Sequence, residues 1–518
     1  MSREANARPP DPSAADAERT PVRAVEAERT PVRAIEADPS LATLLWTPSA
    51  EELQGRPGYR VGRRIGAGGF AEVYEAELRR PPLPPERVAL KRLLPALRRD
   101  PVRQRQLRRE AQIGSQLRHD HIARVLELLD LGDELAIAME LVEGVQCNHL
   151  LHRIAQQGLR LRRSAAGFIL SGLFEALRYL EAPDGGSRPL VHADLSLENL
   201  MLTQQGVLKL IDFGVAAEDH TTVPPGLGPQ AGPSRSQPHP LADRLADEAL
   251  TSLHQVAGKR TYVPPEGAPR APTVQSDLYA AGVCAWEILA GCRFPLLPKG
   301  VGGPEMGSLI AFAADGQPAA AWILLKSCLA IDPEARMRSA SVGLELVQQL
   351  QGGTPAQQLQ AGLGALVGAL MKAQRAQAEG AATPSLGPLP PAAELLLEPR
   401  DFIAELVRRI QSAFCAHRVL ALRPDAADPS AVLGGAGYRA LPFLLRAEYG
   451  EAGPLPRESL LRAALDTGYL RGDDGTLCFR VRPPGDTAHV VCVQPGPGHR
   501  YEPLAEMLLR NLLVPTAR

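Results

Sequence analysis

The chain has 518 residues, with 57 Lys and Arg against 58 Asp and Glu and a formal net charge of −1. This length has room for about three domains, and the near-neutral charge argues against a general nucleic-acid or membrane-surface binder, since both need a basic excess. The seven cysteines include no Cys-x-x-Cys pair, which argues against a zinc ribbon and a disulfide framework and favours a reducing, cytoplasmic compartment. No run of 18 uncharged apolar residues predicts a membrane span, and residues 1–13 lack the apolar run of a secretory signal.

The first 55 residues are rich in Ala, Glu, Arg and Pro, and their weak apolar periodicity predicts a disordered tail. They contain a tandem decapeptide, AERTPVRAVE followed by AERTPVRAIE, with a Thr-Pro pair in each copy, at Thr20 and Thr30. The repeat has two interpretations: a duplicated phosphorylation or docking site, or coding slippage in a tolerant tail. We favour the second interpretation.

From Tyr59 the pattern becomes regular and predicts a β-rich part followed by a helical part, residues 59–352 in all. The predicted elements are strands on both sides of a Gly turn over 59–78, a strand at 87–93, a helix at 101–118, strands at 123–131 and 135–142, a helix at 164–182, short strands flanking a turn at 203–206, and mostly helix from 272 to 352. Nine of the twenty residues from 221 to 240 are Pro or Gly, which predicts a flexible loop.

Two further segments complete the predicted organisation. Residues 353–397 are expected to be a helical and Pro-rich linker, and residues 398–518 a small α+β domain of unknown role. In that domain, a predicted helix at 456–467 precedes strands at 476–482 and 489–494, a pattern that superficially suggests a winged helix. Because the region is not strongly basic, we expect a protein-binding or regulatory role and not nucleic-acid binding.

Two motifs in the β-rich part are suited to binding phosphates. In GAGGFAEVY (66–74), Gly66 and Gly68 allow the backbone to approach phosphates closely, because no Cβ intrudes. Strands on both sides indicate a hairpin lid, whereas a dinucleotide fold would place a helix directly after the glycines. Lys91, in VALK, can reach the first two phosphates of a nucleotide, and Glu110 on the following helix can hold that ammonium.

Two later motifs carry the groups for proton and metal chemistry. In VHADLSLENLML, Asp194 can orient an attacking hydroxyl or accept its proton. Asn199 in the same motif and Asp212 in LKLIDFG offer oxygen ligands, which Mg²⁺ prefers.

These motifs, in this order and at this spacing, resemble a eukaryotic-like Ser/Thr protein kinase of the bacterial type, from about Tyr59 to Leu350. The resemblance implies an α+β, bilobal fold with a small β-rich N-lobe and a larger helical C-lobe. It implies Mg²⁺-dependent transfer of the γ-phosphoryl group of ATP to Ser or Thr hydroxyls of protein substrates, with possible self-phosphorylation and a place in signal transduction. The metal ligands would be Asn199 and Asp212, and the catalytic residues Asp194, Lys91 and Glu110.

The resemblance also implies an ATP-binding set and three bracing contacts. MELVEG (139–144) resembles the segment that holds the adenine. The implied ATP-binding residues are Ile65, Gly66, Ala67, Gly68, Gly69, Phe70, Val73, Ala89, Lys91, Met139, Glu140 and Val142. In GKRTYVPPE, Glu266 would pair with Arg336, and Asp277 would brace the catalytic loop.

The sequence departs from the family pattern in the catalytic loop. Ala193 stands where the family has an Arg that binds an activating phosphate, so activation by that route is not expected. Ser196 stands where the family has a Lys, and Lys259 where it has a Thr. We hypothesise that Lys259 places the missing ammonium near Asp194 and the γ-phosphate; the alternative is an exposed lysine without a role.

Gly114, four residues after Glu110, replaces a bulky apolar residue and is expected to leave a gap, so that the helix would need support from the N-terminal tail or the C-terminal region. The long segment from 214 to 264 is either a docking loop or a tolerated insertion, and the second is favoured. Its candidate autophosphorylation sites are Thr221, Thr222, Ser234 and Ser236.

Two alternative functions remain open at the level of the sequence. The first is a pseudokinase that acts as a nucleotide-binding signalling scaffold, and the second is a small-molecule kinase. The departures that favour a pseudokinase are Ala71, Gly114, Ala193, Ser196 and Lys259. Against it, every phosphate- and metal-binding group of the family is present, and these groups carry the chemistry.

Overall fold

The computed structural model describes most of the chain from residue 58 onward. The described ranges are 58–80, 82–130, 134–183, 188–214, 216–218, 259–267, 273–378, 388–424, 443–450, 455–483, 488–496 and 499–513. The N-terminal tail with its decapeptide repeat lies outside these residues, and so do the candidate phosphorylation sites between 219 and 258.

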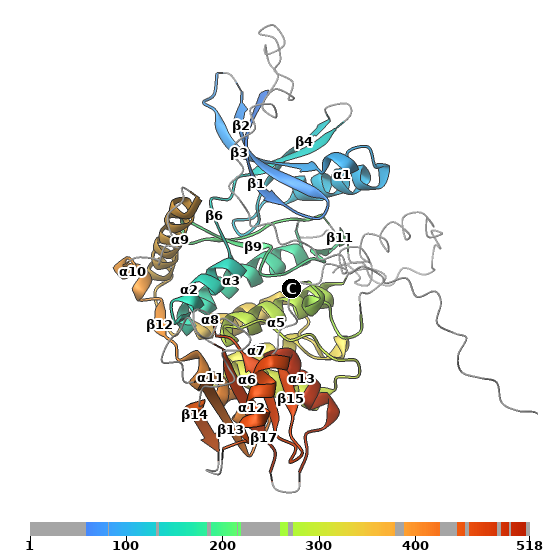
Figure 1. The fold of residues 1–518 in the computed structure, drawn as a ribbon. Coiled ribbons are helices and arrows are strands. Elements are labelled where there is room, and N and C mark those ends of the chain that lie inside the picture. The colour runs from blue at the N-terminus through green and yellow to red at the C-terminus, as the bar shows by residue number, and fades with distance from the viewer. Residues whose placement is uncertain are drawn as a thin grey trace, which may run out of the picture. The chain divides into compact units, whose positions relative to one another are not determined.

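The first part of the described chain is a five-stranded antiparallel sheet with one helix on it. In sheet order the strands are β1 (Gly58–Ala67), β2 (Ala71–Arg79), β3 (Glu86–Leu93), β5 (Leu135–Glu140) and β4 (Val125–Asp130). The helix α1 (Pro101–Gln116) contacts β4 and β5 (Figure 1). It begins where the Asp100 side chain accepts the Val102 N–H at 2.8 Å, with proline at the first helical position. The strands and the helix that the sequence predicts in this region are confirmed.

Successive side chains of β5 point to opposite faces of this sheet, and each face carries a small hydrophobic core. Leu135 and Ile137 pack with Leu107 of α1, whereas Ala136 and Ala138 point to the opposite face. This is the period of two that a strand imposes on its side chains. The sheet is therefore buried on both faces at β5, which fixes the strand that leads into the predicted adenine segment.

The expected gap at Gly114 is absent. A Cβ at this position would lie 2.4 Å from Cγ2 of Val125, so the side chain of β4 occupies the space. The prediction of a cavity beside α1 is wrong, because whether a helical glycine leaves a void depends on which strand packs against it.

The next part is mainly helical. Its helices are α2 (Cys147–Gln156), α3 (Arg163–Glu181), α5 (Val274–Ala290), α6 (Gly303–Ala314), α7 (Ala319–Cys328) and α8 (Ala340–Leu350). Short strands lie beside them: β6 (Gly144–Gln146) pairs with β9 (Leu200–Thr203) and β9 with β10 (Leu208–Leu210), while β8 (Leu190–Val191) pairs with β11 (Ala217–Glu218). Helix α5 is almost wholly buried and mostly apolar, as is typical of a helix surrounded by other helices, and its buried carboxylates are Asp277 and Glu287. The predicted helical character of 272–352 is confirmed. No helix in the described ranges is long and apolar enough to span a bilayer.

The predicted linker contains a helix that packs against the helical part. Helix α9 (Ala356–Ala378) contacts α3, β6 and β9 (Figure 1) and buries a face of small and aliphatic residues. The backbone of α9 and the backbone of the β9–β10 turn approach each other closely. A Cβ at Gly364 of α9 would lie 2.5 Å from the Gln204 carbonyl oxygen of the turn, and a Cβ at Gly206 of the turn would lie 1.9 Å from the Gln360 carbonyl oxygen of α9. Beyond α10 (Pro391–Glu394), β12 (Leu397–Pro399) pairs with β7 (Leu159–Leu161).

The last part of the chain is a second five-stranded antiparallel sheet with three helices. In sheet order the strands are β14 (Phe443–Gly450), β13 (Arg418–Pro424), β17 (His489–Gln494), β16 (Leu477–Val481) and β15 (Tyr469–Arg471), and the helices are α11 (Phe402–Ala413), α12 (Glu458–Thr467) and α13 (Pro503–Leu513). The two predicted strands, β16 and β17, lie inside this sheet, where β16 pairs with β15 and β17 pairs with β13. The superficial winged-helix pattern is therefore not formed, because these strands belong to a five-stranded sheet and not to a two-stranded wing. The α+β character of this region is as predicted.

Ion pairs attach this C-terminal region to the helical part. Arg400 donates to the carbonyl oxygens of Ala290 and Gly291 at 2.9 and 2.8 Å, where the C-terminal end of α5 carries negative partial charge. Glu405 pairs with Arg400 at 2.9 Å and with Arg409, whose side chain is 1% exposed, at 2.5 Å. These contacts, and a hydrophobic core continuous from α3 to α11, make the region part of the same folded unit.

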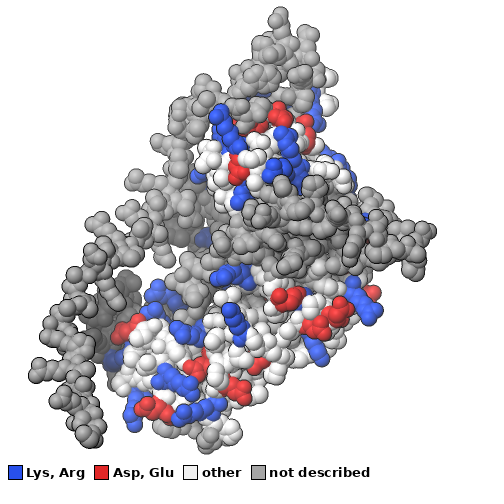
Figure 2. Space-filling view, turned by 90° about the vertical axis from the view of Figure 1, so that its right-hand side faces the viewer, with Lys and Arg blue, Asp and Glu red and all other residues white. Residues whose placement is uncertain are grey.

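The described surface carries both charge signs. On the face shown in Figure 2, basic and acidic side chains are interspersed, in line with the net charge of −1.

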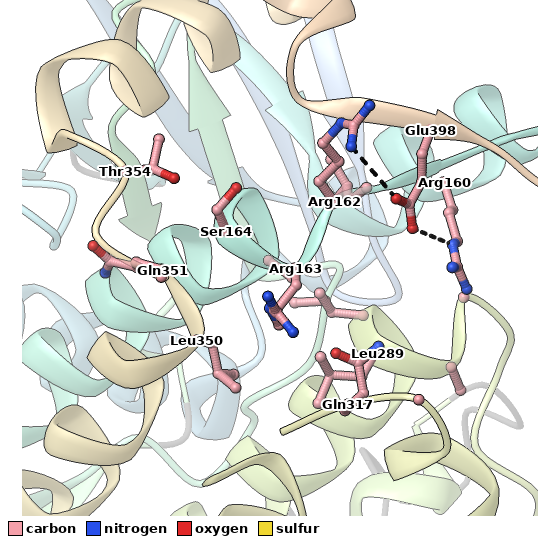
Figure 3. A pocket seen from close by; sticks show the side chains of 17 residues that line it. Arg160, Arg162, Arg163, Ser164, Leu289, Gln317, Leu350, Gln351, Thr354 and Glu398 are labelled. Carbon is pink, nitrogen blue, oxygen red and sulfur yellow. Dashed lines mark hydrogen bonds and ion pairs between the residues drawn. The ribbon is translucent and has the colours of Figure 1, made fainter. Parts of the chain in front are cut away.

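A pocket of about 390 Å³ lies between the helical part and β12. Its lining includes Arg160, Arg162, Arg163 and Glu398 (Figure 3). Glu398 already pairs with Arg160 at 2.6 Å and with Arg162 at 3.7 Å. None of the residues of the four sequence motifs lines this pocket, so the candidate site is elsewhere.

The packing of α9 predicts opposite effects for two identical substitutions one turn apart. Gly368→Ala should stabilise the chain by up to about 1 kcal/mol, because alanine favours a helix and a Cβ there meets nothing within 4 Å. Gly364→Ala should destabilise it by about 1–3 kcal/mol, because the methyl group would push α9 away from the backbone of Gln204. Melting temperatures of the full chain would measure both, and equal shifts would contradict the packing of α9 on the β9–β10 turn.

Candidate active site

The β1–β2 hairpin forms the glycine-rich turn that the sequence predicts. The Gly68 N–H donates to the Ala71 carbonyl oxygen at 2.8 Å and closes the turn. A Cβ added at Gly66 would meet its nearest atom at 3.7 Å, and one at Gly69 would meet nothing within 4 Å. The fold itself therefore leaves open space beside these glycines, as a loop that must receive a ligand requires.

Strand register brings the predicted nucleotide-binding residues together. Val73 on β2 is the partner of Lys91 on β3, and Ala89 on β3 is the partner of Met139 on β5. The Glu140 N–H donates to the Arg124 carbonyl oxygen at 2.8 Å, so the backbone group that Glu140 can offer to a base is its carbonyl oxygen. Ile65 and Ala67 lie on β1 and Phe70 in the hairpin turn, while Val142 follows the end of β5.

Lys91 lies between two carboxylates from different elements. Its Nζ is 2.7 Å from Oε1 of Glu110 on α1 and 2.8 Å from Oδ1 of Asp212, which follows β10. The side chains of Lys91 and Glu110 are 12% and 6% exposed, whereas that of Asp212 is 41% exposed. One buried ammonium thus connects the sheet, the helix and the segment after β10.

Burial and the neighbouring charges shift the pKa values of Glu110, Asp212 and Lys91 in different ways. Burial raises the pKa of Glu110 to about 7, and the Asp212 charge adds to the rise, although Lys91 acts against it. Burial would also raise the pKa of Asp212, but the Lys91 ammonium, the Gly214 N–H and Lys259 together hold it below its usual range. Burial works to lower the pKa of Lys91, and the two carboxylates outweigh it, so this pKa lies above its usual value. Asp212 and Lys91 therefore stay charged near neutral pH, and Glu110 is the group that titrates there.

A carboxylate of helix α5 holds the backbone of the loop that carries Asp194. The Asp277 carboxylate accepts the N–H of His192 at 2.6 Å and that of Ala193 at 3.0 Å. These two bonds hold Ala193 at a φ of 63°, in the left-handed region that alanine rarely adopts. The predicted bracing of the loop by Asp277 is confirmed.

Asn199 and Asp212 have the chemistry of a Mg²⁺ site. The Asn199 Nδ2 donates to Asp194 at its carbonyl oxygen, 2.6 Å away, and at Oδ2, 3.0 Å away, which leaves the amide oxygen of Asn199 as its ligand atom. The Oδ1 atom of Asp212 accepts hydrogen bonds from the Lys91 ammonium and from the Gly214 N–H, which is 3.1 Å away. Within the described ranges no three or more His, Cys, Asp or Glu cluster into a ready-made metal site. A few oxygen ligands completed by substrate phosphates and waters are what Mg²⁺ uses, so the two residues fit this ion.

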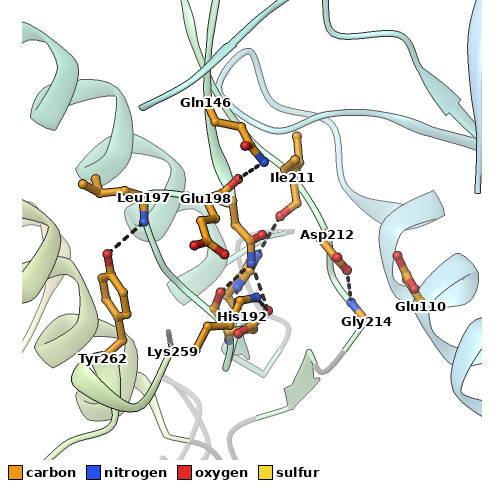
Figure 4. Close-up of polar contacts among 12 residues, drawn as sticks. Glu110, Gln146, His192, Leu197, Glu198, Ile211, Asp212, Gly214, Lys259 and Tyr262 are labelled. Carbon is orange, nitrogen blue, oxygen red and sulfur yellow. Dashed lines mark hydrogen bonds and ion pairs between the residues drawn. The ribbon is translucent and has the colours of Figure 1, made fainter. Parts of the chain in front are cut away.

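Lys259 reaches the same loop from a distant part of the sequence. Its Nζ donates to Oδ2 of Asp194, and the two side chains are only 18% and 13% exposed. Figure 4 shows Lys259 beside His192 of this loop. The predicted proximity of Lys259 to Asp194 is confirmed, and the exposure that the alternative assumed is not observed. The role of Lys259 stays a prediction.

The segment after Lys259 is anchored on both sides. Arg336, whose side chain is fully buried, holds the Glu266 carboxylate at 2.6 and 2.7 Å, as predicted. Tyr262 was not singled out from the sequence. Its hydroxyl donates to Glu287 of α5 at 2.6 Å and accepts the Leu197 N–H at 3.4 Å, the contact drawn in Figure 4. Its position inside GKRTYVPPE is the signal that could have identified it.

Sequence reasoning also missed Lys209 on β10. Its Nζ is 2.9 Å from Oε1 of Glu140, directly beside the predicted adenine segment. The chain has only six lysines among its 57 basic residues. In the described part of the chain, every lysine ion pair lies in this site, and the lysines that form them are Lys91, Lys209 and Lys259. The rarity of lysine is the signal that could have pointed to Lys209.

Comparison with known proteins agrees with this geometry. The family model of the protein kinase domain matches residues 59–343. The chain belongs to the protein kinase family. The α+β kinase fold that the resemblance implied is confirmed.

Curated relatives are bacterial serine/threonine-protein kinases. The kinase PkaA of Streptomyces coelicolor is 27% identical over 438 residues, which cover 79% of this chain and 69% of PkaA. A probable serine/threonine-protein kinase of the same organism is 31% identical over 238 residues, 45% of this chain and 30% of the relative. In several such relatives the matched part spans less than a third of their own length. The solved kinase domain of Mycobacterium tuberculosis PknI is 24% identical, covering 57% of this chain and 96% of that domain, with a TM-score of 0.39.

The brace under the catalytic loop predicts a loss of stability on removal of its carboxylate. Asp277→Ala leaves the buried N–H groups of His192 and Ala193 without acceptors, which should cost about 2–5 kcal/mol of the free energy of unfolding. Asp277→Asn keeps one acceptor oxygen and should lose less. Denaturant titration of both variants would measure the difference, and a loss below about 1 kcal/mol in Asp277→Ala would show that other contacts hold the loop.

Proposed function

We propose that this chain transfers the γ-phosphoryl group of ATP to Ser or Thr hydroxyls of protein substrates, in a reaction that depends on Mg²⁺. The observation that carries the proposal is the convergence of Lys91, Glu110 and Asp212 within 2.8 Å, beside a loop that presents Asp194 and Asn199. This set supplies a phosphate-binding cation, oxygen ligands for a metal and a carboxylate for the acceptor. We also propose self-phosphorylation and a place in signal transduction, which membership of the protein kinase family suggests.

Binding would use the sheet and the glycine-rich turn. The backbone of Gly66, Gly68 and Gly69 would cover the phosphates, and Lys91 would hold the α- and β-phosphates while Glu110 keeps its ammonium in place. The adenine would lie between Ala89 and the segment from Met139 to Val142. Asn199 and Asp212 would hold Mg²⁺, which, when bound, neutralises charge on the phosphates.

Transfer would be centred on Asp194. The acceptor oxygen attacks the γ-phosphorus, the bond from that phosphorus to the oxygen of ADP breaks, and the hydroxyl proton passes to Asp194. Asn199 donates to Asp194 Oδ2 and so fixes the orientation of this carboxylate before the acceptor arrives. Positioning and charge neutralisation supply most of the rate in such a reaction.

Radiolabelled ATP with a generic basic protein would test the proposal. The wild-type chain should transfer label in the presence of Mg²⁺, and Asp212→Ala should lose at least about 100-fold in rate, because it removes a metal ligand. Calorimetry should show uptake of MgATP by the wild-type chain and weaker uptake by Lys91→Met. A wild-type chain that binds no adenine nucleotide, with or without Mg²⁺, would refute the proposal.

The raised pKa of Glu110 predicts an acid limb in the pH profile of kcat/KM for ATP. Below about pH 7 the buried carboxyl is protonated and no longer holds the Lys91 ammonium, so kcat/KM should fall as the pH falls through this value. Glu110→Gln should be slow at all pH values and should lack the limb. ATP itself changes its ionic form over this pH range, and this affects the wild-type chain and Glu110→Gln equally. The difference between the two pH profiles therefore reports the titration of Glu110. Identical profiles would contradict the assignment of the acid limb to Glu110.

A further inference from the structure

The carboxylate of Asp194 is neutralised by a cation from outside its own loop. Lys259 directly precedes the turn at Arg260–Tyr262, 65 residues away in sequence, and its Nζ donates to Asp194 Oδ2. Both side chains are more than four-fifths buried. A lysine on the surface would be solvated, whereas this ammonium is held inside the site by the carboxylate it faces.

The loop itself has no such cation. Residues 190–200 contain no Lys or Arg. The His192 ring accepts the Asp194 N–H on Nδ1 at 3.3 Å, so this nitrogen carries no proton, and burial lowers the pKa of the ring. Ser196, two residues after Asp194, is 1% exposed, and its Oγ has no hydrogen-bond partner among the described residues. In the described part of the chain, Lys259 is the cation that contacts Asp194.

We propose that Lys259 is the cation that contacts the transferred phosphoryl group. The loop around Asp194 has no Lys or Arg that could make this contact. The inference rests on the proposed function. Asp194 must lie next to phosphoryl oxygens that carry negative charge during transfer, and an ammonium between them removes the repulsion. An ammonium has three N–H donors. One is used by Asp194, and the others can face the phosphoryl oxygens.

A covalent probe tests the position of Lys259 without relying on turnover. An acyl phosphate derivative of ATP transfers its acyl group to an amine that lies beside the terminal phosphate and releases ATP. We expect acylation of Lys91 and Lys259 that excess MgATP suppresses, whereas acylation of Lys299, Lys326 and Lys372 should not depend on MgATP. If Lys91 is protected and Lys259 is not labelled or not protected, the inference fails while the proposed function stands. If no lysine is protected, both fail.

Substitutions test the contribution to the rate. Lys259→Met should lower kcat by about 100- to 1,000-fold and change the Kd of MgATP by less than about threefold, because the cation acts on the transition state. Lys259→Arg, which keeps the charge, should have a kcat at least about tenfold higher than that of Lys259→Met. The neighbouring Arg260 is exposed and forms no ion pair with another described residue. Arg260→Ala is therefore the matched control and should keep kcat within about twofold.

The outcomes separate the inference from the proposed function. A Lys259→Met chain with wild-type kcat, in an assay where Asp212→Ala is inactive, would overturn the role of Lys259 and leave the phosphoryl transfer intact. Equal losses of kcat and MgATP affinity in Lys259→Met and Lys259→Arg would also overturn it, because they would indicate a structural role.

Discussion

The contact of Lys91 with Glu110 and Asp212 is the interaction around which the site is organised. It joins three elements that are 19 and 121 residues apart in sequence, and it does so with one cation and two carboxylates in a largely buried place. Removing charges from water is costly unless they are paired, so the three elements are held in the one arrangement that pairs them. The carboxylates outnumber the ammonium, which leaves the more exposed one, Asp212, suited to attract a metal ion.

A third carboxylate of the site, that of Asp194, is held in the same way. Asp194 lies on a loop whose backbone is held by Asp277 from α5, and its charge is paired with that of Lys259, 65 residues further along the chain. The carboxylates of Glu110 and Asp212 and the carboxylate of Asp194 are therefore each paired with a lysine through tertiary contact. In a chain whose basic residues are mostly arginine, this use of a compact ammonium places a single charge where a planar guanidinium would need more room.

The C-terminal region is integrated with the helical part of the kinase domain. Helix α9 lies on the turn between β9, which directly follows Asn199, and β10, which precedes Asp212. Arg400 caps the end of α5, the helix that braces the catalytic loop. A partner that moved this region would act on elements that carry Asn199 and Asp277. The protein-binding or regulatory role that we propose for the region has a physical path to the site through these contacts.

The sequence by itself determined the elements and the chemistry of the site. The regular pattern that begins at Tyr59 predicted the strands around Lys91. Glycine, ammonium, carboxylate and amide groups at their observed spacing predicted phosphate and Mg²⁺ binding, because those signals are local. Only the tertiary structure decided which side chains meet across long separations. It placed Val125 in the space beside Gly114, joined Lys209 to Glu140 and put the strands after α12 inside a sheet. Such contacts depend on how whole elements pack, and a pattern along the chain does not contain that information.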